Sequence, residues 1–177
     1  RQSHLSDWDF IIARCSMHGF LIQTQGATNI FIGKPTLSAS STLKLTLGDN
    51  IISFQGSVNA ENQPGNIQWK AWDDANQQVI SAMSHEPTLN KQGNNSPANL
   101  SSSLSQSSQQ FYTSTPQTES TLQNIADSEL LLKRLQSISG KVSCQGNSHV
   151  KPGDLIKLDG VGSRLSGDAF VSELTHT

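Results

Sequence analysis

The residues most able to do chemistry are two pairs of close carboxylates, Asp7/Asp9 and Asp73/Asp74. Paired carboxylates carry out the acid, base and nucleophilic steps of glycoside hydrolases. A structural explanation fits both pairs better. Asp7 and Asp9 follow Ser6 at the expected start of a helix, where anions meet the positive end of the helix dipole, and the Asp73-Asp74 pair has the composition of a turn. We therefore predict no catalytic residue and no enzymatic activity.

The histidines and cysteines are spaced too widely to predict a metal site. No two of the five histidines have HExxH or HxH spacing. Cys15 and Cys144 lack CxxC spacing, and we expect both to be small buried side chains. The glycine-rich segment 160–167 lacks the GxxxxGK(S/T) pattern of a phosphate loop and favours a hairpin loop. The sequence predicts neither a metal nor a cofactor.

Three tryptophans are the residues most able to supply interface energy, because Trp is enriched among binding hot spots. We expect Trp8, on the apolar face of the first helix, to be buried in the core of its own chain. Trp69 and Trp72 are three positions apart in an expected strand, so their side chains point to opposite faces of the sheet. Both cannot enter the same core. One of the two is therefore our candidate for a contact with another subunit or domain.

Charge and hydropathy exclude two classes of partner. The chain has 12 Lys and Arg against 14 Asp and Glu, with a net charge of −2, so it lacks the basic excess that phosphate binding requires. Its longest apolar runs fall far short of the roughly 20 residues that cross a bilayer. We predict no nucleic-acid partner and no membrane insertion by this segment. Because the sequence starts without Met or a signal peptide, we expect it to be cut from a longer protein.

Periodicity predicts an α+β fold, with an antiparallel sheet, two amphipathic helices and a small β-barrel or half-barrel. Residues 1–90 are the expected α+β domain. A helix runs from Ser6 to about His18 and stops at Gly19, and a hairpin pairs 20–22 with 30–32. Further strands are expected at 43–47, 51–54, 67–71 and 79–83. Because short turns join them, we expect antiparallel pairing.

The second half divides into a polar stretch and a closing domain. Residues 91–120 are rich in Ser, Asn and Gln, and we predict a flexible linker or excursion. The alternative is a stretch that pairs with a neighbouring subunit. Residues 121–177 are the expected closing domain. Its helix is expected to begin just after Pro116, at the end of the polar stretch, and to end at Gly140. Strands near 142–144, 155–158 and 170–174 then close the barrel.

Three groups of residues stand in a distinctive order along the chain. The first is SDWDF at 6–10, followed by Arg14 and Gly19-Phe20; the second is 45–57 with Trp72-Asp73. The third runs from Pro152-Gly153-Asp154 through the glycine-rich loop and 170–172 to His176. In this order they resemble the VgrG and phage late-control gene D family of tail-hub proteins. The resemblance spans most of the chain, leaves the Ser/Asn-rich stretch unmatched, and departs from the family pattern at Leu5 and Leu165.

The resemblance implies a structural hub component of a contractile injection apparatus, either a type VI secretion spike or a phage-tail or tailocin baseplate. Such a hub is a homotrimer that joins a hexameric tube to a trimeric spike, and 121–177 would close one of its barrels. Its partners would be the tube protein, the spike or needle, and baseplate proteins. It would be assembled in the bacterial cytoplasm and then belong to the secreted or extracellular tail or spike complex. The alternative is a cell-envelope-acting carbohydrate-binding module or hydrolase.

Overall fold

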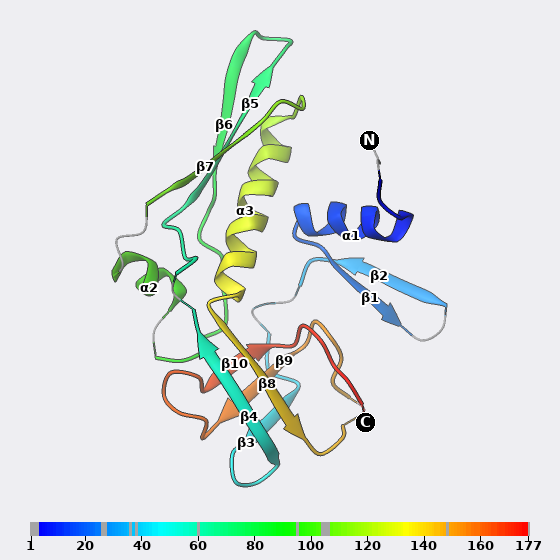
Figure 1. The fold of residues 1–177 in the computed structure, drawn as a ribbon, viewed down its shortest axis with the longest axis vertical. Coiled ribbons are helices and arrows are strands. Elements are labelled where there is room, and N and C mark those ends of the chain that lie inside the picture. Colours follow the sequence, from blue (N-terminus) through cyan, green and yellow to red (C-terminus); the bar gives the residue numbers. More distant parts are fainter. Residues whose placement is uncertain are drawn as a thin grey trace. The chain divides into compact units, whose positions relative to one another are not determined.

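The structure is a computed structural model that describes residues 4–25, 28–35, 37, 39–59, 61–94, 96–103, 107–147 and 149–176. It confirms the predicted α+β class with mostly antiparallel strands (Figure 1). The helices are α1 (Asp7–Met17), α2 (Pro97–Ser103) and α3 (Glu119–Leu135). Within the described ranges no sheet closes into a barrel. None of the helices there combines the length and the apolar character that a bilayer span requires.

The described residues contain ten strands, which form four small sheets. The strands are β1 (Leu21–Gln25), β2 (Asn29–Gly33), β3 (Leu43–Thr46), β4 (Ile51–Val58), β5 (Ile67–Asp73), β6 (Gln78–Met83), β7 (Gln109–Thr113), β8 (Ile138–Cys144), β9 (Leu155–Asp159) and β10 (Gly167–Phe170). The sheet orders are β1-β2, β10-β9-β3, β4-β8 and β6-β5-β7. Strand β3 pairs with β9 and β5 with β7 in parallel, and these two pairings between distant segments were not predicted from the sequence. Each pair is joined by a connection long enough for a parallel return.

The chain folds into two compact units, each built from three separate segments. Unit 1 contains residues 1–35, 64–87 and 107–132, and unit 2 contains 36–63, 88–106 and 133–177. The division expected from sequence, 1–90, 91–120 and 121–177, is contiguous, whereas the two units interleave. Residues 97–103 of the expected flexible stretch are helical and 109–113 form a strand. Strand β7 receives its backbone hydrogen bonds from β5, and such pairing does not depend on apolar side chains.

Helix α1 of unit 1 begins and ends where the sequence predicts. Ser6 is the N-cap: its Oγ accepts from the Asp9 N–H at 3.2 Å and donates to the Asp9 carboxylate at 2.6 Å. At the other end Gly19 has φ +68°, and the Phe20 N–H donates to the Cys15 carbonyl at 2.9 Å. No residue of α1 is buried. The expectation that Trp8 lies in the core is therefore wrong: it is 43% exposed.

Helix α3 supplies the core of unit 1 beneath the β6-β5-β7 sheet. Leu122 is fully buried and packs with Ala71 of β5 and Ala82 of β6, and Trp69 and Ile80 lie at the margin of this cluster. The helix stops at Leu135 and not at Gly140. Its chain then turns through residues 136–137 into β8, as the Ser137 hydroxyl donates to the Arg134 carbonyl at 2.7 Å.

Gly140 belongs to strand β8 of unit 2, where it lies opposite Gly56 of β4. A Cβ added at Gly140 would stand 2.7 Å from the Gln55 carbonyl oxygen. The glycine therefore allows close approach of two strands and does not act as a helix stop. Among the residues that the structure describes, the buried apolar side chains that form the core of unit 2 are Leu45, Ile51, Val150, Ile156, Leu158 and Val171.

Candidate interaction site

The β6-β5-β7 sheet of unit 1 separates Trp69 from Trp72, as their odd spacing predicts. On the inner face, the Trp69 ring stacks on Phe111 of β7 with centroids 5.1 Å apart. Its indole Nε1 donates to the Glu129 carboxylate of α3 at 2.8 Å. Trp72 lies on the other face and is 47% exposed. The sheet therefore uses Trp69 within the chain and leaves Trp72 available at the surface.

Trp72 shares this outer face with other exposed apolar side chains. The register sets Trp72 directly opposite Val79 and Gln68 opposite Met83 on β6, and Lys70 beside Tyr112 on β7. Exposed large apolar side chains here are Trp72, Val79, Met83 and Tyr112. We call these four residues, with Lys70 and Gln110, the outer sheet face.

Polar groups on the outer sheet face are held together around Tyr112. The Lys70 ammonium lies 5.7 Å from the centre of the Tyr112 ring, within the range of a cation–π contact. The Tyr112 hydroxyl and the Lys70 ammonium both donate to the Gln110 side-chain oxygen, at 3.2 and 3.5 Å. Aromatic side chains with a polar handle are typical of the centres of protein interfaces. The arrangement suits binding of another surface.

Asp73 organises the turn that joins β5 to β6. Its carboxylate accepts from the backbone N–H groups of Ala75 and Asn76, at 3.0 and 3.3 Å, and from the Asn76 side-chain amide at 2.7 Å. These hydrogen bonds, the one from the Asn76 side chain above all, hold the pKa of Asp73 below its ordinary value. Such an Asp is suited to hold a turn, and the geometry agrees with the structural explanation of the Asp73-Asp74 pair.

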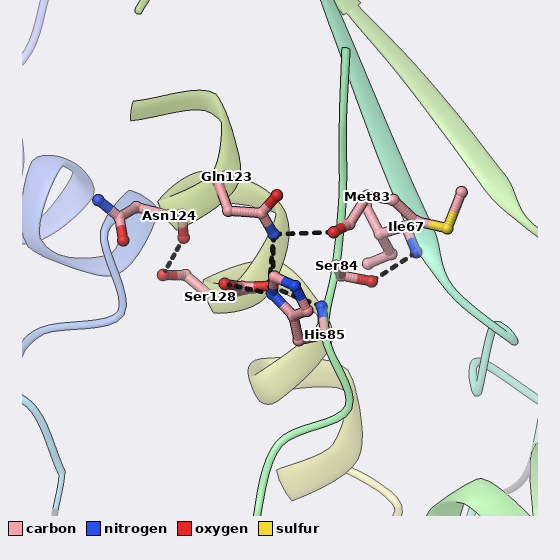
Figure 2. Close-up of polar contacts among 8 residues, drawn as sticks. Ile67, Met83, Ser84, His85, Gln123, Asn124 and Ser128 are labelled. Carbon is pink, nitrogen blue, oxygen red and sulfur yellow. Dashed lines mark hydrogen bonds and ion pairs between the residues drawn. The ribbon is translucent and has the colours of Figure 1, made fainter. Parts of the chain in front are cut away.

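One polar cluster was not predicted from the sequence. His85, just after β6, lies against Gln123 of α3 (Figure 2), and Asp127 of the same helix is also within hydrogen-bonding distance of its ring. The Gln123 amide donates to the Met83 carbonyl at 2.8 Å and to the Asp127 carboxylate at 2.9 Å, which uses both of its hydrogens. The His85 Nδ1, 3.2 Å from Asp127, is then the donor to that carboxylate. The i, i+4 spacing of Gln123 and Asp127 is the signal that sequence could have offered.

The His85 cluster fastens a chain segment to a helix. The His85 backbone N–H also donates to the Asp127 carboxylate, at 2.7 Å, so one carboxylate holds both the backbone and the ring. The His85 side chain is 78% exposed.

In the part of the chain that the structure describes, no three His, Cys, Asp or Glu side chains gather into a metal-binding group. Cys15 and Cys144 are free and half-buried, so the expectation of full burial is wrong for both.

The glycine-rich segment forms the loop between β9 and β10, which pair as an antiparallel hairpin. Gly160 and Gly162 have φ of +72° and +100°, conformations that favour glycine. The Gly162 carbonyl accepts from the backbone N–H groups of Leu165 and Ser166, at 3.1 and 2.9 Å. The predicted hairpin loop is confirmed. At its start Asp159 pairs with Lys44 at 3.0 Å, which lowers the pKa of Asp159.

Two solved structures are similar to nearly all of this chain. One is the tail protein from Neisseria meningitidis MC58, with a TM-score of 0.61 and 13% identity over 90% of this chain and 47% of that one. The other is the 43 kDa tail protein of prophage MuSo2 from Shewanella oneidensis, with a TM-score of 0.59 and 11% identity over 95% of this chain and 47% of that one. The chain thus spans about half the length of either protein.

These likenesses confirm a tail-protein fold. Neither solved structure is described as a VgrG protein, so the resemblance to VgrG hub proteins in particular stays a prediction. No curated protein sequence matches the chain significantly. The family described as the Alg8 N-terminal domain matches residues 1–177, and the chain therefore belongs to that family.

Proposed function

We propose that this chain is a structural component of a phage-tail-like contractile injection apparatus, and that it serves in the hub that joins tube to spike. The observation that carries the proposal is the fold, which matches a tail protein from Neisseria meningitidis over 90% of the chain and a prophage tail protein from Shewanella oneidensis over 95%. The family description names a domain and no activity. The ordered VgrG-like segments, SDWDF at 6–10 above all, favour the hub among tail components.

The proposed hub is a non-enzymatic homotrimer. Its partners would be the tube protein, the spike or needle, and baseplate proteins, and its final location the secreted or extracellular tail complex. The outer sheet face supports a binding role, because Trp72 and Tyr112 are exposed there together. Trp72 is therefore the better of the two interface candidates, since Trp69 already packs on Phe111 and bonds to Glu129.

The direct test is to locate the full-length protein in assembled particles. Sheared and purified tail or spike particles from the native cells should contain the protein, and electron microscopy with a labelled copy should place it at the tube–spike junction. Particles that assemble normally in cells lacking the gene would contradict the proposal. So would a label found away from this junction.

The interface role of the outer sheet face is tested in the same particles. Trp72→Ala should lower incorporation, because truncation of an interface Trp commonly costs more than about 1 kcal/mol of binding free energy. Val58→Ala is the matched control, since Val58 is 43% exposed on β4 of unit 2. Equal incorporation of both variants at the wild-type level would remove Trp72 from the interface.

A further inference from the structure

Strand β7 lies at the edge of its sheet, and its outer edge pairs with no other strand in the described part of the chain. The sheet order β6-β5-β7 ends at β7, which is hydrogen-bonded there to β5. The Gln109 backbone N–H donates to the Asn66 carbonyl at 3.0 Å, so residue 109 faces β5. Because the backbone groups of successive strand residues point to opposite edges, Gln110 and Tyr112 direct their N–H and C=O groups away from the sheet.

The β7 edge lacks the features that usually protect a free strand. Such edges are blunted by Lys, by Pro, by a bulge or by a covering segment. Strand β7 has the sequence Gln-Gln-Phe-Tyr-Thr, without charge or proline, and its register with β5 is unbroken. The opposite edge of the sheet differs, because the Gln123 side chain of α3 donates to the Met83 carbonyl of β6 at 2.8 Å. The β7 edge is therefore the more accessible of the two.

An extended polypeptide is the partner that such an edge selects. A row of outward N–H and C=O groups is satisfied by another strand, which joins the sheet through main-chain hydrogen bonds. The side chains of an added strand alternate between the two faces and lie beside those of β7. On the inner face the neighbour is Phe111, stacked on Trp69, which suits an apolar side chain. On the outer sheet face the neighbours are Gln110 and Tyr112.

The outer sheet face offers a positive charge beside the β7 edge. The Lys70 ammonium lies 5.7 Å from the centre of the Tyr112 ring and 3.5 Å from the Gln110 side-chain oxygen, both on β7. Among the described residues, no carboxylate lies within ion-pair distance of Lys70. A carboxylate on an added strand would supply the missing opposite charge. A second copy of β7 would bring no carboxylate and a second Lys70, so the charges favour a foreign segment over another copy of this chain.

We propose that the β7 edge accepts an extended segment of a partner protein as a fourth strand of the β6-β5-β7 sheet. The segment carries Asp or Glu on the outer sheet face, beside Tyr112, and apolar side chains on the inner face, beside Phe111. The inference deepens the proposed binding role of the outer sheet face, and it rests on the proposed function for the identity of the protein that donates the segment.

A capped peptide of alternating Glu and Val is the probe, and fluorescence anisotropy with the full-length protein measures its dissociation constant. Methylation of the Glu nitrogens or of the Val nitrogens removes the backbone donors from one edge of the peptide. One methylated peptide should therefore bind about tenfold or more weakly, and the other like the parent. A Lys/Val peptide should also bind about tenfold more weakly, because it meets Lys70 with a like charge. No saturable binding of the Glu/Val peptide, or equal binding of all four peptides, would overturn the inference.

Proline substitution tests the same edge from the side of the protein. Gln110→Pro removes an outward N–H of β7 and leaves the hydrogen bonds to β5 in place, since proline is tolerated where a strand N–H faces solvent. Affinity for the Glu/Val peptide should fall about tenfold or more. Ser81→Pro is the matched control, because Ser81 lies on the β6 strand at the opposite side of β5, and it should bind like wild type. A folded Gln110→Pro variant that keeps wild-type affinity would contradict the proposal.

A third variant does not depend on how the strand tolerates proline. Lys70→Met keeps the length of the side chain and removes its charge, so it should weaken binding of the Glu/Val peptide and reduce the difference between this peptide and the Lys/Val peptide. An unchanged difference would remove Lys70 from the site and overturn the acidic character assigned to the segment.

Two further outcomes separate this inference from its alternatives. Light scattering of the protein without peptide detects pairing between copies, and a mass that falls in Gln110→Pro alone would replace the foreign segment by a second copy. The peptide measurements use purified protein. Absence of the protein from tail particles would therefore contradict the proposed function and leave a positive peptide result standing, whereas a particle component that does not bind the Glu/Val peptide would contradict the inference alone.

Discussion

Trp69 and Trp72 share one strand but meet different surroundings. Trp69 is held by Phe111 and by its hydrogen bond to Glu129, whereas Trp72 has a directly opposite neighbour in Val79 and remains half exposed. The free energy of unfolding should therefore depend on the first indole and the binding of partners on the second.

Replacing the two tryptophans by phenylalanine separates these roles. Trp69→Phe keeps an aromatic ring against Phe111 but removes the donor to Glu129, so we expect a loss of about 1.5–3 kcal/mol in the free energy of unfolding. Trp72→Phe should stay within about 0.5 kcal/mol of wild type. Urea denaturation measures both. Equal losses would mean that the Trp69–Glu129 hydrogen bond contributes no net stability.

Asp73 makes the turn between β5 and β6 sensitive to acid. Because hydrogen bonds from Asn76 lower the pKa of Asp73 in the folded protein, its contribution is present above the ordinary Asp pKa and is lost as pH falls through the lower folded pKa. A carboxyl-detected NMR titration should find Asp73 below its ordinary value. Asn76→Ala, which removes the largest of these interactions, should raise the pKa of Asp73. An unchanged pKa in that variant would contradict the assignment.

At the scale of elements, the fully buried Leu122 is one of the contacts through which helix α3 holds the β6-β5-β7 sheet. Leu122 packs against Ala71 and Ala82, and small residues on the sheet let the helix approach closely. Leu122→Ala should lower the free energy of unfolding by about 2–5 kcal/mol, through lost burial and the cavity left behind. Leu132→Ala on the same helix, at a 41% exposed site, is the control and should have little effect. Thermal denaturation of both variants measures the loss of stability. Similar losses in Leu122→Ala and Leu132→Ala would contradict this packing.

The approach of β4 and β8 in unit 2 depends on a glycine. Gly140→Ala would set a Cβ 2.7 Å from the Gln55 carbonyl oxygen, and a backbone atom cannot move away without separating the strands. We expect a loss of about 1–3 kcal/mol, as for other overpacked sites. Gly146→Ala is the matched control, because nothing lies within 4 Å of its added Cβ. Hydrogen exchange of the β8 amides should rise in the first variant alone.

Sequence patterns predicted the local elements well where one physical cause decides them. The N-cap at Ser6, the stop at Gly19 and the hairpins follow from capping, backbone freedom and turn chemistry, all of which act within a few residues. Gly140 was misread because a helix stop and a close strand approach both select glycine. The exposure of Trp8 could not be read from the amphipathic pattern of α1, which shows an apolar face but not what covers it.

At the scale of the whole molecule, the sequence missed the interleaving of the two units. Strand β7 completes a sheet whose other strands, β5 and β6, lie before residue 90, and helix α3 packs on that sheet. A long polar connection separates β7 from β5 and β6 in the sequence, although all of them belong to unit 1. The polar composition of 91–120 predicts little burial by those residues themselves. Backbone pairing to a distant strand leaves no local signal, so contiguous domains were the natural but incomplete interpretation.

The interleaving predicts how fragments of the chain behave. Residues 1–90 lack β7 and α3, so Ala71 and Ala82, both buried in the intact chain, would lose the Leu122 side chain that packs against them. Residues 1–132 contain every segment of unit 1. We expect the longer fragment to keep the near-ultraviolet circular dichroism of Trp69 stacked on Phe111 and to unfold cooperatively, whereas the shorter one should do neither. A cooperative transition in 1–90 would show that α3 and β7 are not required for the fold of β5 and β6.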